Sequence, residues 1–90
     1  MKRYVIEREV PGFGGMSAGD LCAASRTSNG ALAKLAPRVQ WEHSYVVGNG
    51  TFCIYLAEDE AAVLEHAKLS GFPANRVVEV VTMIDPTTGG

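Results

Sequence analysis

The dipeptide Asn49-Gly50 lies between two β-rich runs, and it constrains the fold more than any other short stretch of the chain. Both central positions of a type I′ turn need a positive φ, which asparagine and glycine tolerate best, so the pair predicts a tight β-hairpin. We expect its strands over roughly residues 38–47 and 51–57.

Two helices are predicted on either side of this hairpin. Ser17 offers an N-cap and Asp20 a carboxylate three residues later, which is typical of a helix start. Pro37 closes that first helix. The second helix begins at residues 58–59, where acidic side chains suit a helix N-terminus, and it stops at Gly71, a residue common just after a helix end.

Two further strands complete the pattern. Residues 3–10 alternate between apolar and polar side chains, and residues 76–84 are rich in β-branched residues. The last residues, 85–90, are expected to fray. The predicted order is β-α-β-β-α-β, which indicates one α+β domain over residues 1–90 with the ferredoxin-like fold, a four-stranded antiparallel sheet carrying both helices on one face.

Charge and hydropathy exclude several classes of partner. The formal net charge is −2 and no basic stripe is present, which argues against nucleic acid and against an anionic membrane. No apolar run approaches the length of a membrane span, and the first residues carry charges where a signal peptide needs an apolar core. We therefore expect a cytoplasmic protein in which Cys22 and Cys53 remain free thiols.

Alternation divides the strand side chains between the two faces of the predicted sheet. The face beneath the helices is expected to carry Val39, Trp41, His43, Tyr45, Val47, Phe52, Ile54 and Leu56, with Tyr4, Ile6, Val78, Val80 and Ile84 from the outer strands. The open face is expected to carry Glu7, Glu9, Gln40, Glu42, Ser44, Val46, Thr51, Cys53, Tyr55, Ala57, Val77, Glu79, Val81 and Met83. Because that face mixes apolar and acidic side chains, we expect it to meet a second copy in a homodimer.

The open face allows two interpretations of its glutamates. Glu7, Glu42 and Glu79 either face water at strand ends or form a carboxylate cluster in a semi-enclosed space. In the second case the pKa of one carboxyl would rise, suiting it to proton transfer or cation binding. Cys53 and Tyr55 would then shape a ligand pocket in a small enzyme or small-molecule binder.

The two histidines need a separate explanation. His43 lies among apolar neighbours, where a hydrogen-bonded core or edge histidine is the common case. His66 lies at the centre of the apolar stripe of its helix and is expected to point at the sheet or at a subunit interface. Alternation puts His43 and Cys53 on different faces of the sheet, which argues against Cys–His catalysis. No Cys-x-x-Cys or His-x-x-x-His pair is present to indicate a preformed metal site.

The stretches "WEHSYVVGNGTFCIYLA", "EHAKLSGFPANRVVEV" and "IDPTT" resemble a family of small bacterial proteins of unknown function, some of whose members are named nickel-binding proteins. The similarity runs from "RYVIEREVPG" to the C-terminus. It implies a ferredoxin-like fold, a homodimer, and metal binding in at least some members. His43, Cys53, His66 and the Gly71-Phe72-Pro73 run stand at the family's motif positions.

Three functional hypotheses follow. The first is a homodimeric metal-binding protein, with Ni²⁺ held by His43, His66 and Glu42, since imidazole and carboxylate are reasonable nickel ligands. The second is an enzyme or small-molecule binder using the open face, with Glu7, Cys53, Tyr55 and Glu79 around the ligand. The third is a structural or regulatory dimer without ligand. No organic cofactor is implied.

Overall fold

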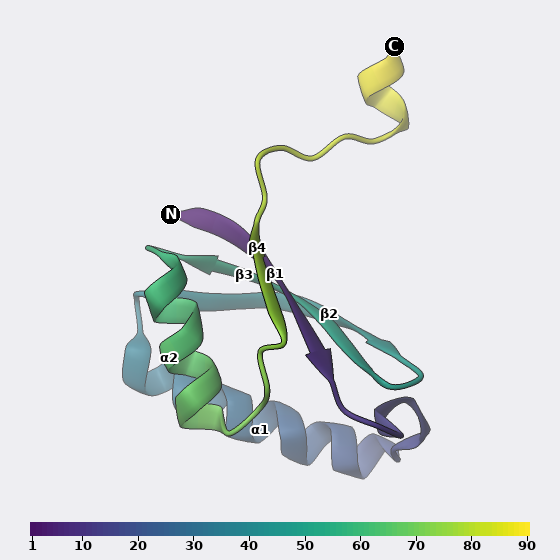
Figure 1. Ribbon diagram of the computed structural model, residues 1–90, viewed down its shortest axis with the longest axis vertical. Helices are drawn as coiled ribbons and strands as arrows, with labels where there is room; N and C mark the ends of the chain where they lie inside the picture. The colour runs from purple at the N-terminus through teal and green to yellow at the C-terminus, as the bar shows by residue number, and fades with distance from the viewer.

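The computed structural model describes residues 1–90 and has the predicted order of elements. Its elements are β1 (Lys2–Glu9), the 3-10 turn η1 (Phe13–Gly15), α1 (Ala18–Leu35), β2 (Val39–Val47), β3 (Gly50–Ala57), α2 (Glu60–Ser70), β4 (Arg76–Glu79) and the 3-10 turn η2 (Pro86–Gly89). The strands form one antiparallel sheet in the order β2-β3-β1-β4, with both helices on one side of it (Figure 1). This arrangement confirms the predicted ferredoxin-like fold.

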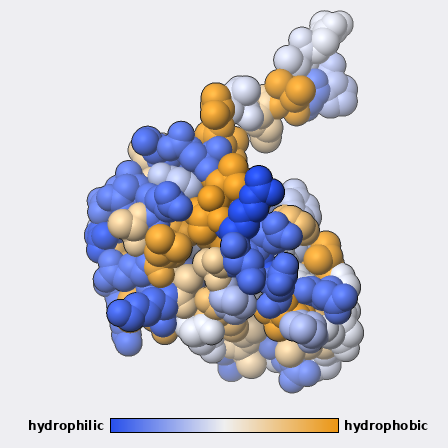
Figure 2. Space-filling view, viewed as in Figure 1, coloured by the Kyte–Doolittle hydropathy of each residue, from blue (hydrophilic) through white to orange (hydrophobic).

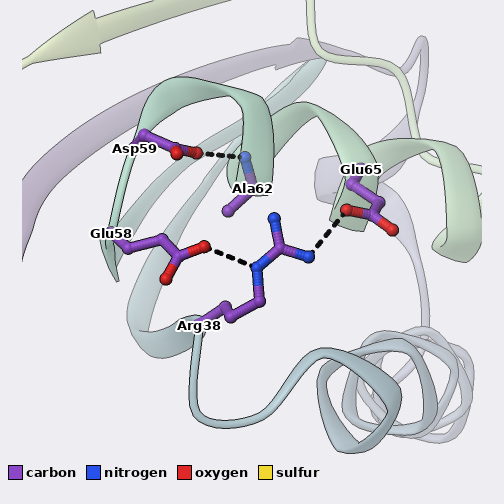
Figure 3. Close-up of polar contacts among 5 residues, drawn as sticks. All are labelled: Arg38, Glu58, Asp59, Ala62 and Glu65. Carbon is purple, nitrogen blue, oxygen red and sulfur yellow. Dashed lines mark hydrogen bonds and ion pairs between the residues drawn. The ribbon is translucent and has the colours of Figure 1, made fainter.

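Local capping signals place the helix ends as predicted. The Oγ of Ser17 accepts a hydrogen bond from the backbone N–H of Asp20 at 3.1 Å, at the start of α1. Asp59 caps α2 by accepting from the N–H of Ala62 at 2.8 Å (Figure 3). Gly71 ends α2 with a φ of +78°, a left-handed conformation that glycine adopts without steric cost.

Arg38, just before β2, ties that strand to α2. Its Nε donates to Glu58 at 2.6 Å and its Nη1 to Glu65 at 3.0 Å, so one guanidinium bridges two carboxylates (Figure 3). All three side chains are solvent-accessible, so the bridge contributes more to orientation than to stability.

The hairpin turn differs from the prediction by one residue. Val47 pairs with Gly50, so the two turn residues are Gly48 and Asn49, and neither has a positive φ. The type I′ prediction is therefore wrong. Gly50 is instead the first residue of β3, where a side chain is excluded because a Cβ there would lie 1.9 Å from the carbonyl oxygen of Arg8.

A β-bulge at Glu42 changes the alternation within β2. The register shifts between Trp41 and His43, so the side chains after the bulge exchange faces. Val39 and Trp41 face the helices as predicted, whereas His43, Tyr45 and Val47 lie on the open face. In β3 the prediction is inverted along the whole strand: Thr51, Cys53, Tyr55 and Ala57 are buried beneath the helices, and Phe52, Ile54 and Leu56 lie on the open face.

The outer strands confirm the prediction for β1 and overturn it for β4. Tyr4 and Ile6 are buried on the helix side. Val77 pairs with Ile6 and packs against the core, and Glu79 pairs with Tyr4, so both belong to the helix side. Val78 lies on the open face instead, 41% exposed.

The last strand is also shorter than predicted. β4 ends at Glu79, although the N–H of Val80 still donates to the carbonyl of Arg3, which puts Val80 over the open face rather than beneath the helices. The chain then leaves the body, and residues 81–90 project away from it (Figure 1). Val81 and Ile84 therefore belong to neither face of the sheet, whereas Met83 lies beside the open face together with Thr82.

Candidate functional site

The sheet separates the predicted metal ligands. His43 is exposed on the open face, with its ring edge-on to Tyr45 at 5.1 Å between ring centroids. Glu42, in the bulge beside it, accepts a hydrogen bond from the Nε of Arg3 at 2.6 Å, and this partner lowers the pKa of the Glu42 carboxyl. His66 lies on α2, on the other side of the sheet, and is fully buried. One chain thus does not bring the three together, and no group of three His, Cys, Asp or Glu side chains is placed to hold a metal ion.

His43 and Glu42 do share a groove on the open face. This groove has a volume of about 480 Å³ and lies between the sheet and the segment that follows β4. Its walls are formed by Arg3, Val5, Glu42, His43, Tyr45, Ile54, Val80, Thr82 and Met83. It offers one imidazole and one ion-paired carboxylate, so a metal bound there would need further ligands from water or another molecule.

The predicted carboxylate cluster does not form. Glu79 lies on the helix side, where it pairs with Lys2 at 3.2 Å. Glu7 lies on the open face opposite Phe52, four residues along β1 from Arg3 and its partner Glu42. The carboxyl of Glu42 has a lowered pKa, the reverse of the shift expected for a crowded cluster, because Arg3 stabilises its charged form.

Cys53 and Tyr55 line a second hollow, on the helix side rather than on the open face. This cavity has a volume of about 190 Å³ and lies between α1 and the sheet. It is lined by Arg8, Val10, Phe13, Leu21, Ala24, Ser25, Ser28, Trp41, Ser44, Val46, Thr51, Cys53, Tyr55 and Phe72. We call it the α1 cavity.

A buried polar cluster adjoins the α1 cavity. The Nη1 of Arg8 donates to the carbonyl of Pro73 at 2.7 Å, and its Nη2 donates to the hydroxyl of Tyr55 at 3.4 Å. The Nε2 of His66 lies 3.1 Å from the Oγ of Ser28, and the His66 ring lies 5.1 Å from that of Tyr55. His66 therefore points at the sheet, as its place in the apolar stripe of α2 predicted.

Burial controls the protonation of this cluster. Desolvation and the nearby charge of Arg8 lower the pKa of His66 from 6.5 to about 4, so its imidazole is neutral at pH 7. Burial likewise raises the pKa of Tyr55. The Nδ1 of His66 has no hydrogen-bond partner. The cluster thus combines a cationic guanidinium with neutral hydrogen-bonding groups.

Sequence reasoning missed Arg8 and Ser28. The signal for Arg8 was its position, because residue 8 has the same alternation parity as the buried Tyr4 and Ile6. A charged residue at an inward-facing strand position is unusual enough to indicate a role. Ser28 likewise occupies a buried position of α1 that apolar residues share.

Both cysteines are free, as predicted. Both occur on the helix side of the sheet, where Cys22 is exposed on α1 and Cys53 is buried with its Sγ 3.2 Å from the Oγ1 of Thr51.

Neither helix has the combination of length and apolar character needed to cross a membrane.

Comparison with known proteins identifies the family. The family model described as "Nickel responsive protein SCO4226-like" matches residues 4–80. The chain belongs to this family. The resemblance found in the hairpin and in the end of α2 is thereby confirmed.

A solved structure supports the same conclusion for the fold. The crystal structure of SCO4226 from Streptomyces coelicolor A3(2) superposes with a TM-score of 0.76 at 15% sequence identity, over 91% of this chain and 99% of that one. At this identity the likeness concerns the fold alone. No curated protein sequence gives a significant match.

Proposed function

We propose that this protein is a cytoplasmic homodimer that binds Ni²⁺ as part of a nickel response, with His43 as its main protein ligand. Membership of a nickel-responsive family is the observation that carries this proposal. The structure contributes the position of His43, an exposed imidazole in the groove of the open face.

The open face supports dimerisation. Its central and edge strands expose large apolar side chains, with Tyr45 59%, Val47 42%, Phe52 38% and Val78 41% exposed. Soluble monomers rarely leave a contiguous apolar surface of this kind uncovered. A second copy packed face to face would cover it, and two-fold symmetry would place the same residues on both sides of the interface.

The segment after β4 adds apolar surface to the same side. Val81, Met83 and Ile84 are 92%, 75% and 74% exposed on the part of the chain that projects from the body. Figure 2 shows apolar surface on this segment and on the body where the segment leaves it. A partner molecule lying against β4 would bury both surfaces together.

A dimer would also complete the metal site. One chain supplies His43 and, if Arg3 releases it, the carboxylate of Glu42, whereas Ni²⁺ takes four to six ligands. Packing two open faces together would let ligands from both copies and water share one ion. His66 is a second candidate ligand through its unpaired Nδ1, and it would place nickel within the helix side instead.

The test is native mass spectrometry of chelator-stripped protein titrated with Ni²⁺, with Zn²⁺ and Co²⁺ as comparison ions. We expect a dimer that takes up nickel stoichiometrically. His43→Ala should weaken uptake by at least about tenfold, because even the outer-sphere partners of metal ligands change affinity by about 10- to 100-fold. Gln40→Ala, an exposed change on the same face of β2, is the matched control and should leave uptake unchanged.

Each alternative has its own outcome. Loss of nickel with His66→Gln but not with His43→Ala would move the site to the helix side. A dimer that takes up no nickel at micromolar concentration would refute metal binding and leave a structural or regulatory dimer. A monomer with full nickel affinity would refute the shared site.

A further inference from the structure

Arg8 carries a buried charge without a counter-ion. Only 5% of the residue is exposed, and its two side-chain hydrogen bonds go to neutral groups, the carbonyl of Pro73 and the hydroxyl of Tyr55. The ion pairs of the structure involve Lys2, Arg3 and Arg38, and none includes Arg8. Since buried charges in proteins are normally paired, this guanidinium lacks the anion that such a position usually has.

The α1 cavity adjoins that charge and contains no acid. None of its lining residues is Asp or Glu, so nothing in its wall neutralises Arg8. Ser28, Thr51 and Tyr55 are buried lining residues that add hydroxyl groups near the charge. His66, next to Ser28, is neutral at pH 7. The buried end of the cavity is therefore electropositive, with hydroxyl groups around the charge.

The rest of the cavity is apolar. Phe13, Leu21, Trp41 and Phe72 are half-buried and line it, with Val46 more exposed beside them. Ligand pockets that bury a drug-sized molecule measure about 300–1,000 Å³. The α1 cavity, at about 190 Å³, suits a smaller molecule with one anionic end and one apolar end.

From these observations we propose that the α1 cavity binds a small monocarboxylate with an aromatic or compact aliphatic body, whose carboxylate pairs with the guanidinium of Arg8. An arginine presents two parallel N–H donors to a carboxylate, and such charge-assisted pairs are stronger than neutral hydrogen bonds. The ring or alkyl body lies between α1 and the helix side of the sheet, against Trp41 and Phe72.

The walls of the cavity are held in place before any ligand arrives. The hydrogen bond to Pro73 fixes the guanidinium against the loop that follows α2. η1 is fastened to the hairpin, because the N–H of Gly14 donates to the carbonyl of Gly48 at 3.1 Å and a Cβ on Gly14 would lie 2.6 Å from the carbonyl oxygen of Val47. A preorganised site loses little entropy on binding, which favours affinity.

This site is distinct from the nickel site proposed above. The α1 cavity lies on the helix side of the sheet, whereas His43 lies on the open face. Carboxylate binding can therefore be measured in metal-free protein, and its failure would leave the nickel proposal untouched.

The probe is benzoate, titrated into chelator-stripped protein by isothermal titration calorimetry, with the neutral isostere benzamide as control. Benzamide, which lacks the carboxylate charge, should bind about 10- to 100-fold more weakly than benzoate. At ten times its dissociation constant, benzoate should also raise the melting temperature by roughly 5–10 °C for a domain of this size. Inorganic phosphate tests whether any anion suffices.

Substitutions distinguish the effect of losing the Arg8 charge from the effect of losing the fold. Arg8→Met should abolish the preference for benzoate over benzamide, and Arg26→Met, the same change at an exposed position of α1, should preserve it. If Arg8→Met does not fold, Ser25→Leu provides a second route, because a larger side chain on the cavity wall should exclude benzoate while Arg8 remains.

Three results would overturn the proposal. The first is equal affinity for benzoate and benzamide. The second is benzoate binding that survives both Arg8→Met and Ser25→Leu. The third is a phosphate affinity that matches that of benzoate, which would show a general anion site without a role for the apolar wall.

Discussion

The buried imidazole of His66 should make the folding stability of this protein depend on pH. The groups that face it are Ser28 from α1 and Arg8 and Tyr55 from the sheet, and no carboxylate lies within ion-pair distance. The protonated ring therefore has no counter-ion, and the hydrogen bond with Ser28 is too weak to offset desolvation and the charge of Arg8. Replacing His66 with Gln removes the titrating group while keeping a side chain able to hydrogen-bond Ser28.

The direction of the pH dependence follows from the two pKa values of His66. The pKa of His66 is about 4 in the folded protein and about 6.5 in the unfolded chain. The unfolded state thus binds more protons between these values, so stability is fully present above pH 6.5 and is lost as the pH falls toward 4. Between pH 7 and pH 5 the loss amounts to about 2 kcal/mol.

The assay is urea unfolding of metal-free protein at several pH values between 5 and 7.5. The free energy of unfolding of the unmodified protein should fall by about 2 kcal/mol more over this range than that of the His66→Gln variant. Carboxylates also titrate near pH 5, but they are common to both proteins and cancel in the difference. His43→Gln is the matched control, because it removes an exposed histidine and should keep the pH dependence.

Equal pH dependence in the unmodified protein and the His66→Gln variant would refute this reasoning. An NMR titration gives an independent check, because the ring protons of His66 should show no transition between pH 5 and pH 8. A transition near pH 6.5 would mean that the imidazole reaches water and that its burial does not control its charge.

Two further predictions concern the local structure. Gly50→Ala should lower the free energy of unfolding by about 2 kcal/mol or more, because the added Cβ would meet the backbone of Arg8. Gly15→Ala is the control: no atom lies within 4 Å of its added Cβ, so the free energy of unfolding should change by less than about 0.5 kcal/mol. Similar urea midpoints for both variants would contradict the close approach of β1 and β3. Asp59→Ala should lower the free energy of unfolding by about 1 kcal/mol, because it removes the N-cap hydrogen bond to Ala62. Circular dichroism should show reduced helicity. An unchanged urea midpoint would mean that the cap is dispensable.

The helix ends and the order of elements were predictable because their signals are local. Ser17, Asp59 and Gly71 each act within one turn of their own helix, so their effect needs no knowledge of distant residues. The identity of the fold then followed from the order of elements, since few topologies satisfy β-α-β-β-α-β.

The faces of the hairpin were not predictable in this way. Moving the turn from Asn49-Gly50 to Gly48-Asn49 leaves Tyr45 on the same face as Phe52, as predicted. The bulge at Glu42 is a one-residue change that reverses the side to which the later side chains of β2, and the side chains of β3 beside them, point. That is why Cys53 and Tyr55 lie beneath the helices and His43 on the open face, the reverse of the expected arrangement.

The order of the elements, the helix ends, the fold and the family follow from the amino-acid sequence alone, because capping and motif residues are properties of short segments. Which side chains meet depends on the folded structure. The pairing of β2 with β3 separates His43 from His66, and the pairing of β1 with β3 brings Arg8 to Tyr55, where α1 covers them to form a cavity without an acid. Such groupings depend on the register between strands distant in the chain, which no local signal specifies.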